Sequence, residues 1–447
     1  MIYLDHAAAT PVSTKALDAM LPYFTEDFFN PSAPYLPAKR VREAYEAAKD
    51  QIAHCIGAKG IDLVMTAGAT ESINLAFTAR QNKSLVLATE HTAVLAAAKT
   101  RDYDLISVDK TGLIQLEDLR QKLTDDVDFI SISLANNELG TIQPLADVAE
   151  IIRQTRQERL QRGITTPLYF HTDASQALSL IDISVARLGV DLLTLNAAKC
   201  GGPKGVGALY IAHGVKLTPL TVGGGQERGL RSGTENVPGV VSFATAATES
   251  KTHLAYHRKE YQKMAQILRQ AIKNLSEMHS DVSIVAQNDN FVKHKQNTLI
   301  PQPIFLGSPK HQLANFIPVC FPGIDAERLI YKLEAQGILV STGAACAANK
   351  GTKSHVLAAI GLSDAEIAGS LRISLGSTNT IEQIQQAATI IIETVRLEYA
   401  RLGFASICDK KLKEQSADCE EGEPRKDGRS TGFLDTNDSE SLGGNHA

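Results

Sequence analysis

The spacing of apolar residues alternates between helical and strand periods over about the first 250 residues. Apolar positions at helical spacing begin near residue 38 and stop at Gly57, a typical helix C-terminus. Short apolar runs typical of strands follow, at residues 61–66, 84–89, 105–108, 128–135, 167–172, 190–195 and 206–212. Because strands that alternate with helices form parallel sheets covered on both faces, the pattern predicts an α/β fold with a mainly parallel, seven-stranded sheet.

The pattern differs after about residue 250, where a long polar helix precedes a weakly periodic stretch at 287–310. A further helix is predicted at 326–336, with Asp325 as its N-terminal cap and Gly337 at its end. Two capping boxes follow, Ser363 with Glu366 and Thr380 with Gln383, and the second opens a terminal helix. This part of the chain is typical of a second, smaller domain.

From Asp409 onward the chain has ten acidic and six basic side chains and few large apolar ones. Such a segment cannot bury enough apolar surface to offset its ordering entropy. We therefore expect a large domain at residues 13–257, a small α+β domain formed by 1–12 and 258–405, and a disordered tail at 406–447.

Composition narrows the classes of function. The formal net charge is -5 and there is no long basic block, which argues against nucleic acid as the main partner. Six cysteines occur without a CxxC pair, so neither a zinc site nor a disulfide framework is indicated. The chain opens on a strand-like segment without a signal-peptide pattern, and no apolar run reaches membrane-spanning length. We expect a cytoplasmic protein without a membrane partner, acting on small molecules.

Polar residues follow several of the predicted strands, where ligands of open parallel sheets bind. In chain order they are Gly68 to Ser72, His91, Asn136 with Asn137, Asp173 and Lys199. A desolvated lysine can form an imine with an aldehyde cofactor, an aspartate can bind a pyridinium nitrogen, and an imidazole can stack on the ring. Free N–H groups at a helix start, with the Thr70 hydroxyl, can bind phosphate. Each residue alone has an ordinary structural explanation, but together they match the requirements of pyridoxal 5'-phosphate.

Longer motifs carry a family resemblance that covers all but about the last forty residues. They are Tyr3 to Ala8, Gly68 to Ser72, Thr89 to His91, Asn136 to Gly140, His171 to Gln176, Gly223 to Thr234 and Ser341 to Cys346, with Arg372. On these residues the chain resembles cysteine desulfurases of the iron-sulfur-cluster type. These belong to the class V aminotransferase group of fold-type I pyridoxal phosphate enzymes.

The resemblance implies a role for each matching residue. Ala69 and Thr70 would bind the phosphate of the cofactor, and Thr234 would reach the cofactor phosphate of a partner subunit in a homodimer. Asp173 would pair with the ring nitrogen, His91 would stack on the ring, and Asn137 and Gln176 would contact the ring hydroxyl. Lys199 would form the imine with the cofactor. Arg372, with Asn137, would bind the substrate carboxylate, to which its planar fork of donors is suited.

Cys346 lies in a run of small and polar residues typical of a mobile loop, where a thiol can act as a nucleophile. By the resemblance, Lys199 moves the alpha proton of L-cysteine, His91 exchanges protons with its thiol, and Cys346 attacks its sulfur. The products would be L-alanine and a persulfide on Cys346, passed to an acceptor protein for iron-sulfur cluster assembly or tRNA thiolation.

The sequence departs from the family pattern just before Lys199, where family members commonly have a serine and then a histidine that help to bind the phosphate. Asn196 can still donate a hydrogen bond to the phosphate, but Ala198 cannot. We therefore expect weaker retention of the cofactor. Cys200 is also unusual and is interpreted as a packing residue, and the stretch 287–315 is longer than usual. The alternatives are a selenocysteine lyase, another class V lyase or transaminase, or a degenerate scaffold that keeps the fold without turnover.

Overall fold

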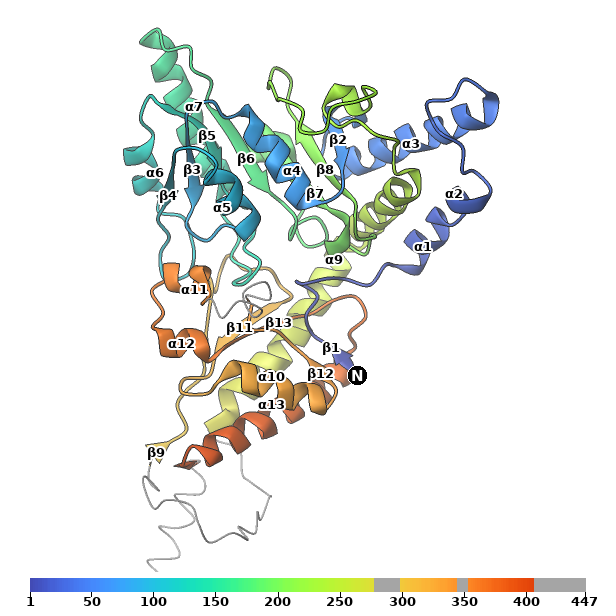
Figure 1. Ribbon diagram of the computed structural model, residues 1–447. Coiled ribbons are helices and arrows are strands. Elements are labelled where there is room, and N and C mark those ends of the chain that lie inside the picture. The colour runs from blue at the N-terminus through green and yellow to red at the C-terminus, as the bar shows by residue number, and fades with distance from the viewer. Residues whose placement is uncertain (277–297, 344–352, 406–447) are drawn as a thin grey trace, which may run out of the picture.

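The computed structural model describes residues 1–276, 298–343 and 353–405. Its helices are α1 (Thr14–Met20), α2 (Pro22–Thr25), α3 (Leu36–Cys55), α4 (Ala69–Ala76), α5 (Thr92–Ala98), α6 (Leu116–Lys122), α7 (Leu145–Gln161), α8 (Val185–Leu188), α9 (Val237–Lys273), α10 (Ala326–Ala335), α11 (His355–Ala359), α12 (Asp364–Ala368) and α13 (Ile381–Arg401). A seven-stranded sheet and its helices form one end of the molecule, and a smaller sheet forms the other, with the long helix α9 running between them (Figure 1).

The large sheet has the strand order β2-β8-β7-β6-β5-β3-β4. Its strands are β2 (Leu63–Thr66), β3 (Lys83–Leu87), β4 (Tyr103–Ile106), β5 (Val127–Ser131), β6 (Tyr169–Asp173), β7 (Leu192–Asn196) and β8 (Gly207–Ile211). Only β8 runs against its neighbours; the other pairs are parallel. The predicted mainly parallel sheet is thus confirmed.

Several predicted boundaries differ from those of the structure by one to four residues. The strand expected at 128–135 ends at Ser131, although the amides of Ile132 and Leu134 still donate to the carbonyls of His171 and Asp173 in β6. The helix expected from about residue 38 begins at Leu36, because Pro37 fits the first helical turn, where its missing N–H costs nothing.

The large sheet is buried on both faces. Leu85 and Leu87 of β3 belong to one apolar cluster and Val86 to another, since successive strand side chains point to opposite faces. Helices α3, α7 and the first part of α9 cover the face of Leu85, and α4 and α5 cover the face of Val86. Because helices cover both faces of the sheet, polar side chains of a binding site can lie only at the ends of its strands.

The smaller sheet has the order β10 (Ile304–Phe305), β11 (Phe316–Cys320) and β13 (Ser370–Ser374), all antiparallel. A separate apolar cluster joins it to α10, α13 and the last part of α9. The first strand of the chain, β1 (Ile2–Tyr3), pairs with β12 (Ile338–Leu339), and β14 (Phe404–Ala405) pairs with β9 (Thr298–Leu299). The N-terminus therefore lies among C-terminal elements (Figure 1).

The capping signals read from the sequence of this region are confirmed. Both predicted boxes form, at Ser363 with Glu366 and at Thr380 with Gln383. Asp325 caps α10 by accepting from the amides of Glu327 and Arg328. Among the described residues, no helix combines the length and the apolar character needed to span a bilayer.

Candidate active site

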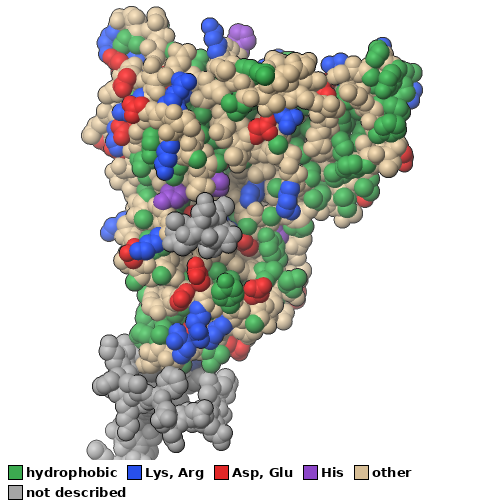
Figure 2. Space-filling model, in the orientation of Figure 1, with side chains coloured by type: hydrophobic (Ala, Val, Ile, Leu, Met, Phe, Trp, Pro, Cys, Tyr) green, Lys and Arg blue, Asp and Glu red, His purple; other side chains and the backbone are tan. Residues whose placement is uncertain are grey.

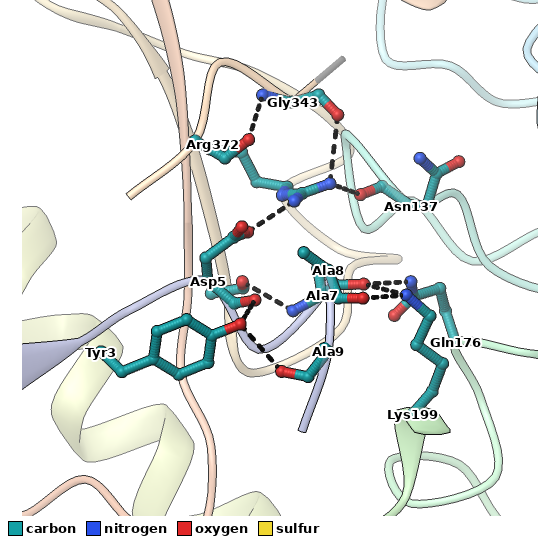
Figure 3. Close-up of polar contacts among 12 residues, drawn as sticks. Tyr3, Asp5, Ala7, Ala8, Ala9, Asn137, Gln176, Lys199, Gly343 and Arg372 are labelled. Carbon is teal, nitrogen blue, oxygen red and sulfur yellow. Dashed lines mark hydrogen bonds and ion pairs between the residues drawn. The ribbon is translucent and has the colours of Figure 1, made fainter. Parts of the chain in front are cut away.

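Lys199 lies at the end of a short 3-10 turn that continues β7. Its Nζ donates hydrogen bonds to the carbonyl oxygens of Ala7, at 2.8 Å, and Ala8, at 2.5 Å (Figure 3). Gln176 donates to the same carbonyl of Ala7, at 2.9 Å. The N-terminal segment therefore crosses the end of the sheet and meets two residues that were predicted to bind the cofactor.

Asp173 ends β6 and His91 follows β3, two strands of the large sheet that are separated by β5. Asp173 is the last residue of β6, is buried, and accepts from the amide of Ser175 at 2.9 Å. His91 caps α5, where its Nδ1 accepts from the amide of Ala93 at 3.1 Å, so the proton of the neutral ring lies on Nε2. Burial lowers the pKa of His91, Asp173 opposes this, and Lys199 adds to it. The imidazole is therefore uncharged at neutral pH, and these three predicted residues interact electrostatically.

The start of α4 lies beside β8 at the same end of the sheet. Gly68 precedes the helix with φ of +146°, and a Cβ on Gly207 would lie 2.7 Å from the Cα of Gly68. Only glycine at position 207 permits this approach. Ala69 is half-buried and Thr70 is exposed in the first turn, where helix N–H groups favour an anion.

Asn196 and Ala198 form the turn before Lys199. The side-chain oxygen of Asn196 accepts from the amide of Ala198 at 3.2 Å. The carbonyl of Ala198 accepts from both the amide and the hydroxyl of Thr10, each at 3.1 Å. The backbone at Ala198 is thus fixed from two sides, and its methyl group offers no donor in place of the family's histidine.

Arg372, on β13, is buried and holds three segments together (Figure 3). Its Nη1 donates to the carbonyl oxygens of Asn137 and Gly343, and its Nη2 lies 2.5 Å from a carboxylate oxygen of Asp5. The backbone of Asn137, not its side chain, makes the contact. Sequence reasoning assigned no role to Asp5, although it lies within the Tyr3 to Ala8 motif.

Thr234 is exposed at the end of the loop 221–234. That loop is held by Glu227, whose carboxylate accepts from the hydroxyl of Tyr45 and the amide of Met65 and pairs with Lys49. Sequence reasoning missed this cluster, because its members come from three separate elements and show no common spacing.

Two buried carboxyl groups near the site were also missed. Glu90 is fully buried and contacts the amide and hydroxyl of Ser133; burial raises its pKa to about 8. Its backbone carbonyl lies 2.9 Å from Nε2 of His355. Glu138 accepts from the hydroxyl of Ser354, and burial raises its pKa as well. Glu90 directly precedes His91 and Glu138 directly follows Asn137. This position next to a predicted site residue is the sequence feature that could have identified them.

Cys346 lies outside the described residues, as do the tail at 406–447 and residues 287–297 of the long stretch. Three described cysteines, Cys55, Cys200 and Cys320, are buried. Burial raises the pKa of Cys200 to about 12, so its thiol stays protonated and packs against the apolar core.

Comparisons with known proteins agree with this geometry. The family model for "Aminotransferase class-V" matches residues 2–296 and 286–387. "Cysteine desulfurase IscS" from Methanosarcina thermophila is 36% identical over 88% of this chain and 92% of its own length. A solved "NifS-like protein" is 31% identical with a TM-score of 0.76, covering 89% of this chain and 99% of its own. A structure of "SspA in complex with cysteine" is 29% identical with a TM-score of 0.66, covering 84% and 99%.

The parallel sheet with a lysine at a strand end is the framework of the class V aminotransferases. The chain belongs to that family and, within it, to the cysteine desulfurases. The resemblance read from the sequence is therefore confirmed.

Proposed function

We propose that this protein is a pyridoxal 5'-phosphate-dependent cysteine desulfurase that converts L-cysteine to L-alanine. The observation that carries the proposal is that Lys199, His91 and Asp173 lie after or at the ends of parallel strands of one sheet, where the charges of the lysine and the aspartate affect the pKa of the imidazole. L-cysteine as the substrate is supported by the names of the relatives and by the cysteine in the complex with SspA.

The residues at the strand ends fit pyridoxal phosphate by their chemistry. Asp173 is a buried carboxylate suited to a pyridinium nitrogen, and Lys199 supplies an amine. The glycine contact between β8 and the start of α4 leaves a helix N-terminus for the phosphate. His91, Asn137, Gln176, Asn196, Ala69 and Thr70 would complete the binding site, with Thr234 from a partner subunit. When bound, the cofactor supplies an electron sink for the substrate's alpha carbon.

Side chains of the protein would bind the substrate and carry out the proton and sulfur transfers. Arg372 binds the substrate carboxylate, and Nζ of Lys199 removes and returns the proton at the alpha carbon. His91, uncharged at neutral pH, takes the proton of the substrate thiol. Cys346 loses its thiol proton, and its sulfur bonds to the substrate sulfur as the carbon–sulfur bond breaks; the released proton is the one that the substrate carbon takes up. One sulfur atom thus moves to Cys346 as a persulfide, and the substrate carbon keeps its electron pair and is protonated to give L-alanine.

A homodimer is part of the proposal. Large apolar side chains are exposed on the arm formed by α1, α2 and the start of α3: Leu17, Leu21, Phe24, Phe28, Tyr35 and Leu36 (Figure 2). Exposed apolar groups gathered in this way favour a protein contact. The persulfide would then pass to an acceptor protein, either a scaffold for iron-sulfur clusters or a carrier for tRNA thiolation.

The test compares the purified protein with Lys199→Ala and Cys346→Ala. We expect a visible cofactor band in the parent protein and in Cys346→Ala, and its loss in Lys199→Ala. Alanine and sulfide should form from L-cysteine, with a reductant, only in the parent protein. A band without alanine would support a transaminase or other lyase, a strong preference for selenocysteine would support a selenocysteine lyase, and absence of the band would support a scaffold.

A further inference from the structure

The guanidinium of Arg372 is already committed to partners within the chain (Figure 3). Its Nη1 donates to the carbonyls of Asn137, at 2.9 Å, and Gly343, at 3.2 Å. Its Nη2 pairs with Oδ1 of Asp5 at 2.5 Å, and its Nε has no partner among the described residues. Both hydrogens of Nη1 are therefore directed at carbonyl oxygens, and the edge formed by Nε and Nη2 is the one left for a second carboxylate.

Asp5 is held in place independently of Arg372. Its backbone forms a parallel bridge with Ser374, and its carbonyl accepts from the hydroxyl of Tyr3 at 2.8 Å. The same hydroxyl contacts the carbonyl of Ala9 at 3.0 Å, which closes the segment 5–9 into a loop. The amide of Ala7 donates to the hydroxyl of Ser374 at 2.9 Å. The carboxylate of Asp5 is thus presented to Arg372 by a fixed backbone.

This loop also supplies the carbonyl oxygens of Ala7 and Ala8 to Nζ of Lys199. One short segment therefore contacts both the lysine and the arginine to which the proposed function assigns the chemistry and the substrate carboxylate. A carboxylate that binds an arginine with two parallel hydrogen bonds needs two adjacent nitrogens. On Arg372 the pair that is not already directed at carbonyl oxygens is Nε and Nη2, and Asp5 already takes one of the hydrogens of Nη2.

We propose that Asp5 is a specificity-determining residue, an internal counter-ion that competes with the substrate carboxylate for the guanidinium of Arg372. The inference rests on the proposed function of Arg372. Two carboxylates beside one guanidinium repel each other. The binding free energy that a ligand carboxylate obtains from Arg372 is therefore reduced by its repulsion from Asp5. A simple carboxylate is thereby disfavoured, whereas an amino acid that is also held near Lys199 can compete with Asp5.

The experiment uses the holoenzyme and the variant Asp5→Asn, which keeps the shape and the acceptor oxygen but removes the charge. The inhibitor 3-mercaptopropionate is a thiol with a carboxylate and no amine. We expect its inhibition constant to fall about tenfold, because a hydrogen bond to a charged group changes binding by about that factor. The KM for L-cysteine should fall in the same direction, with kcat changed less than about twofold. Inhibition by cysteamine, which lacks the carboxylate, should not change.

Asp5→Glu retains the charge and serves as the matched control, with no gain in 3-mercaptopropionate binding expected. Circular dichroism and thermal melting verify folding, and Asp5→Ser replaces Asp5→Asn if the latter does not fold. An unchanged or raised inhibition constant for 3-mercaptopropionate in the neutral variant overturns the inference and leaves Asp5 as a structural support of Arg372. If the parent protein releases no alanine, the proposed function itself fails and the inference fails with it.

Discussion

A buried ion pair between Lys49 and Glu227 fixes the loop that carries Thr234, and its removal gives the sharpest test of the fold. Nζ of Lys49 lies 3.2 Å and 3.1 Å from the two carboxylate oxygens of Glu227. The side chains are only 7% and 5% exposed. Glu227 has a left-handed backbone with φ of +48°, a strained state that persists where surrounding contacts enforce it.

Lys49→Met removes the cation and keeps most of the volume. The carboxylate of Glu227 then retains two donors, the hydroxyl of Tyr45 at 2.6 Å and the amide of Met65 at 2.8 Å. Burial, reinforced by Glu227, raises the pKa of Tyr45 above its ordinary value, so the hydroxyl keeps its proton. Loss of one partner from a buried pair costs about 3 to 5 kcal/mol, and the two remaining donors favour the lower end, a loss of about 3 kcal/mol.

Urea unfolding followed by circular dichroism measures the change for Lys49→Met, Glu227→Gln and the double variant. The double variant should lose less than the sum of the single losses, because it leaves no unpaired buried charge. Lys263→Met is the matched control, because its pair with Glu260 is 50% and 23% exposed and should contribute less than about 1 kcal/mol. A loss below about 1 kcal/mol in Lys49→Met, or additive losses in the double variant, would refute this reasoning.

Three further predictions concern the strand ends. Glu90 has a pKa raised from 4.5 to about 8, so its protonated form stabilises the fold fully below pH 4.5 and that stability is lost as pH rises to 8. Stability relative to Glu90→Gln should therefore fall by about 1.4 kcal/mol per pH unit in that window, measured by urea unfolding. Ala198→His should release pyridoxal phosphate at least about tenfold more slowly on dialysis, followed by absorbance, because one charge-assisted contact is worth about 1.5 to 3 kcal/mol. Gly207→Ala should lower stability by about 1 to 3 kcal/mol in thermal melts and weaken cofactor binding, because its Cβ would meet the Gly68 backbone.

Each of these has a result that contradicts it. A stability difference between the parent protein and Glu90→Gln that is constant from pH 5 to 8 would show that the carboxyl is ionised throughout. Equal dialysis rates for the parent protein and Ala198→His would mean that position 198 does not contact the phosphate. Parental melting and cofactor affinity in Gly207→Ala would show that β8 and the start of α4 can separate without cost.

Much of the large sheet was predictable from the sequence, because its determinants are local. Apolar runs mark each strand, and the boxes at Ser363 and Thr380 are satisfied within one helical turn. The geometry of parallel strands then places the residues that follow them at one edge, which is why His91, Asp173 and Lys199 could be grouped before any contact was known.

The tertiary structure alone decided the contacts between segments far apart in the chain. Asp5 and Arg372 are separated by 367 positions, and Lys199 meets the carbonyl of Ala7 across 192. No periodicity encodes such pairs, because they depend on how the small sheet packs against the large one and on where the first strand pairs. The sequence thus determined which chemical groups lie at the strand ends. The packing of the two sheets decided which groups of the chain bind the charged side chains of Lys199 and Arg372.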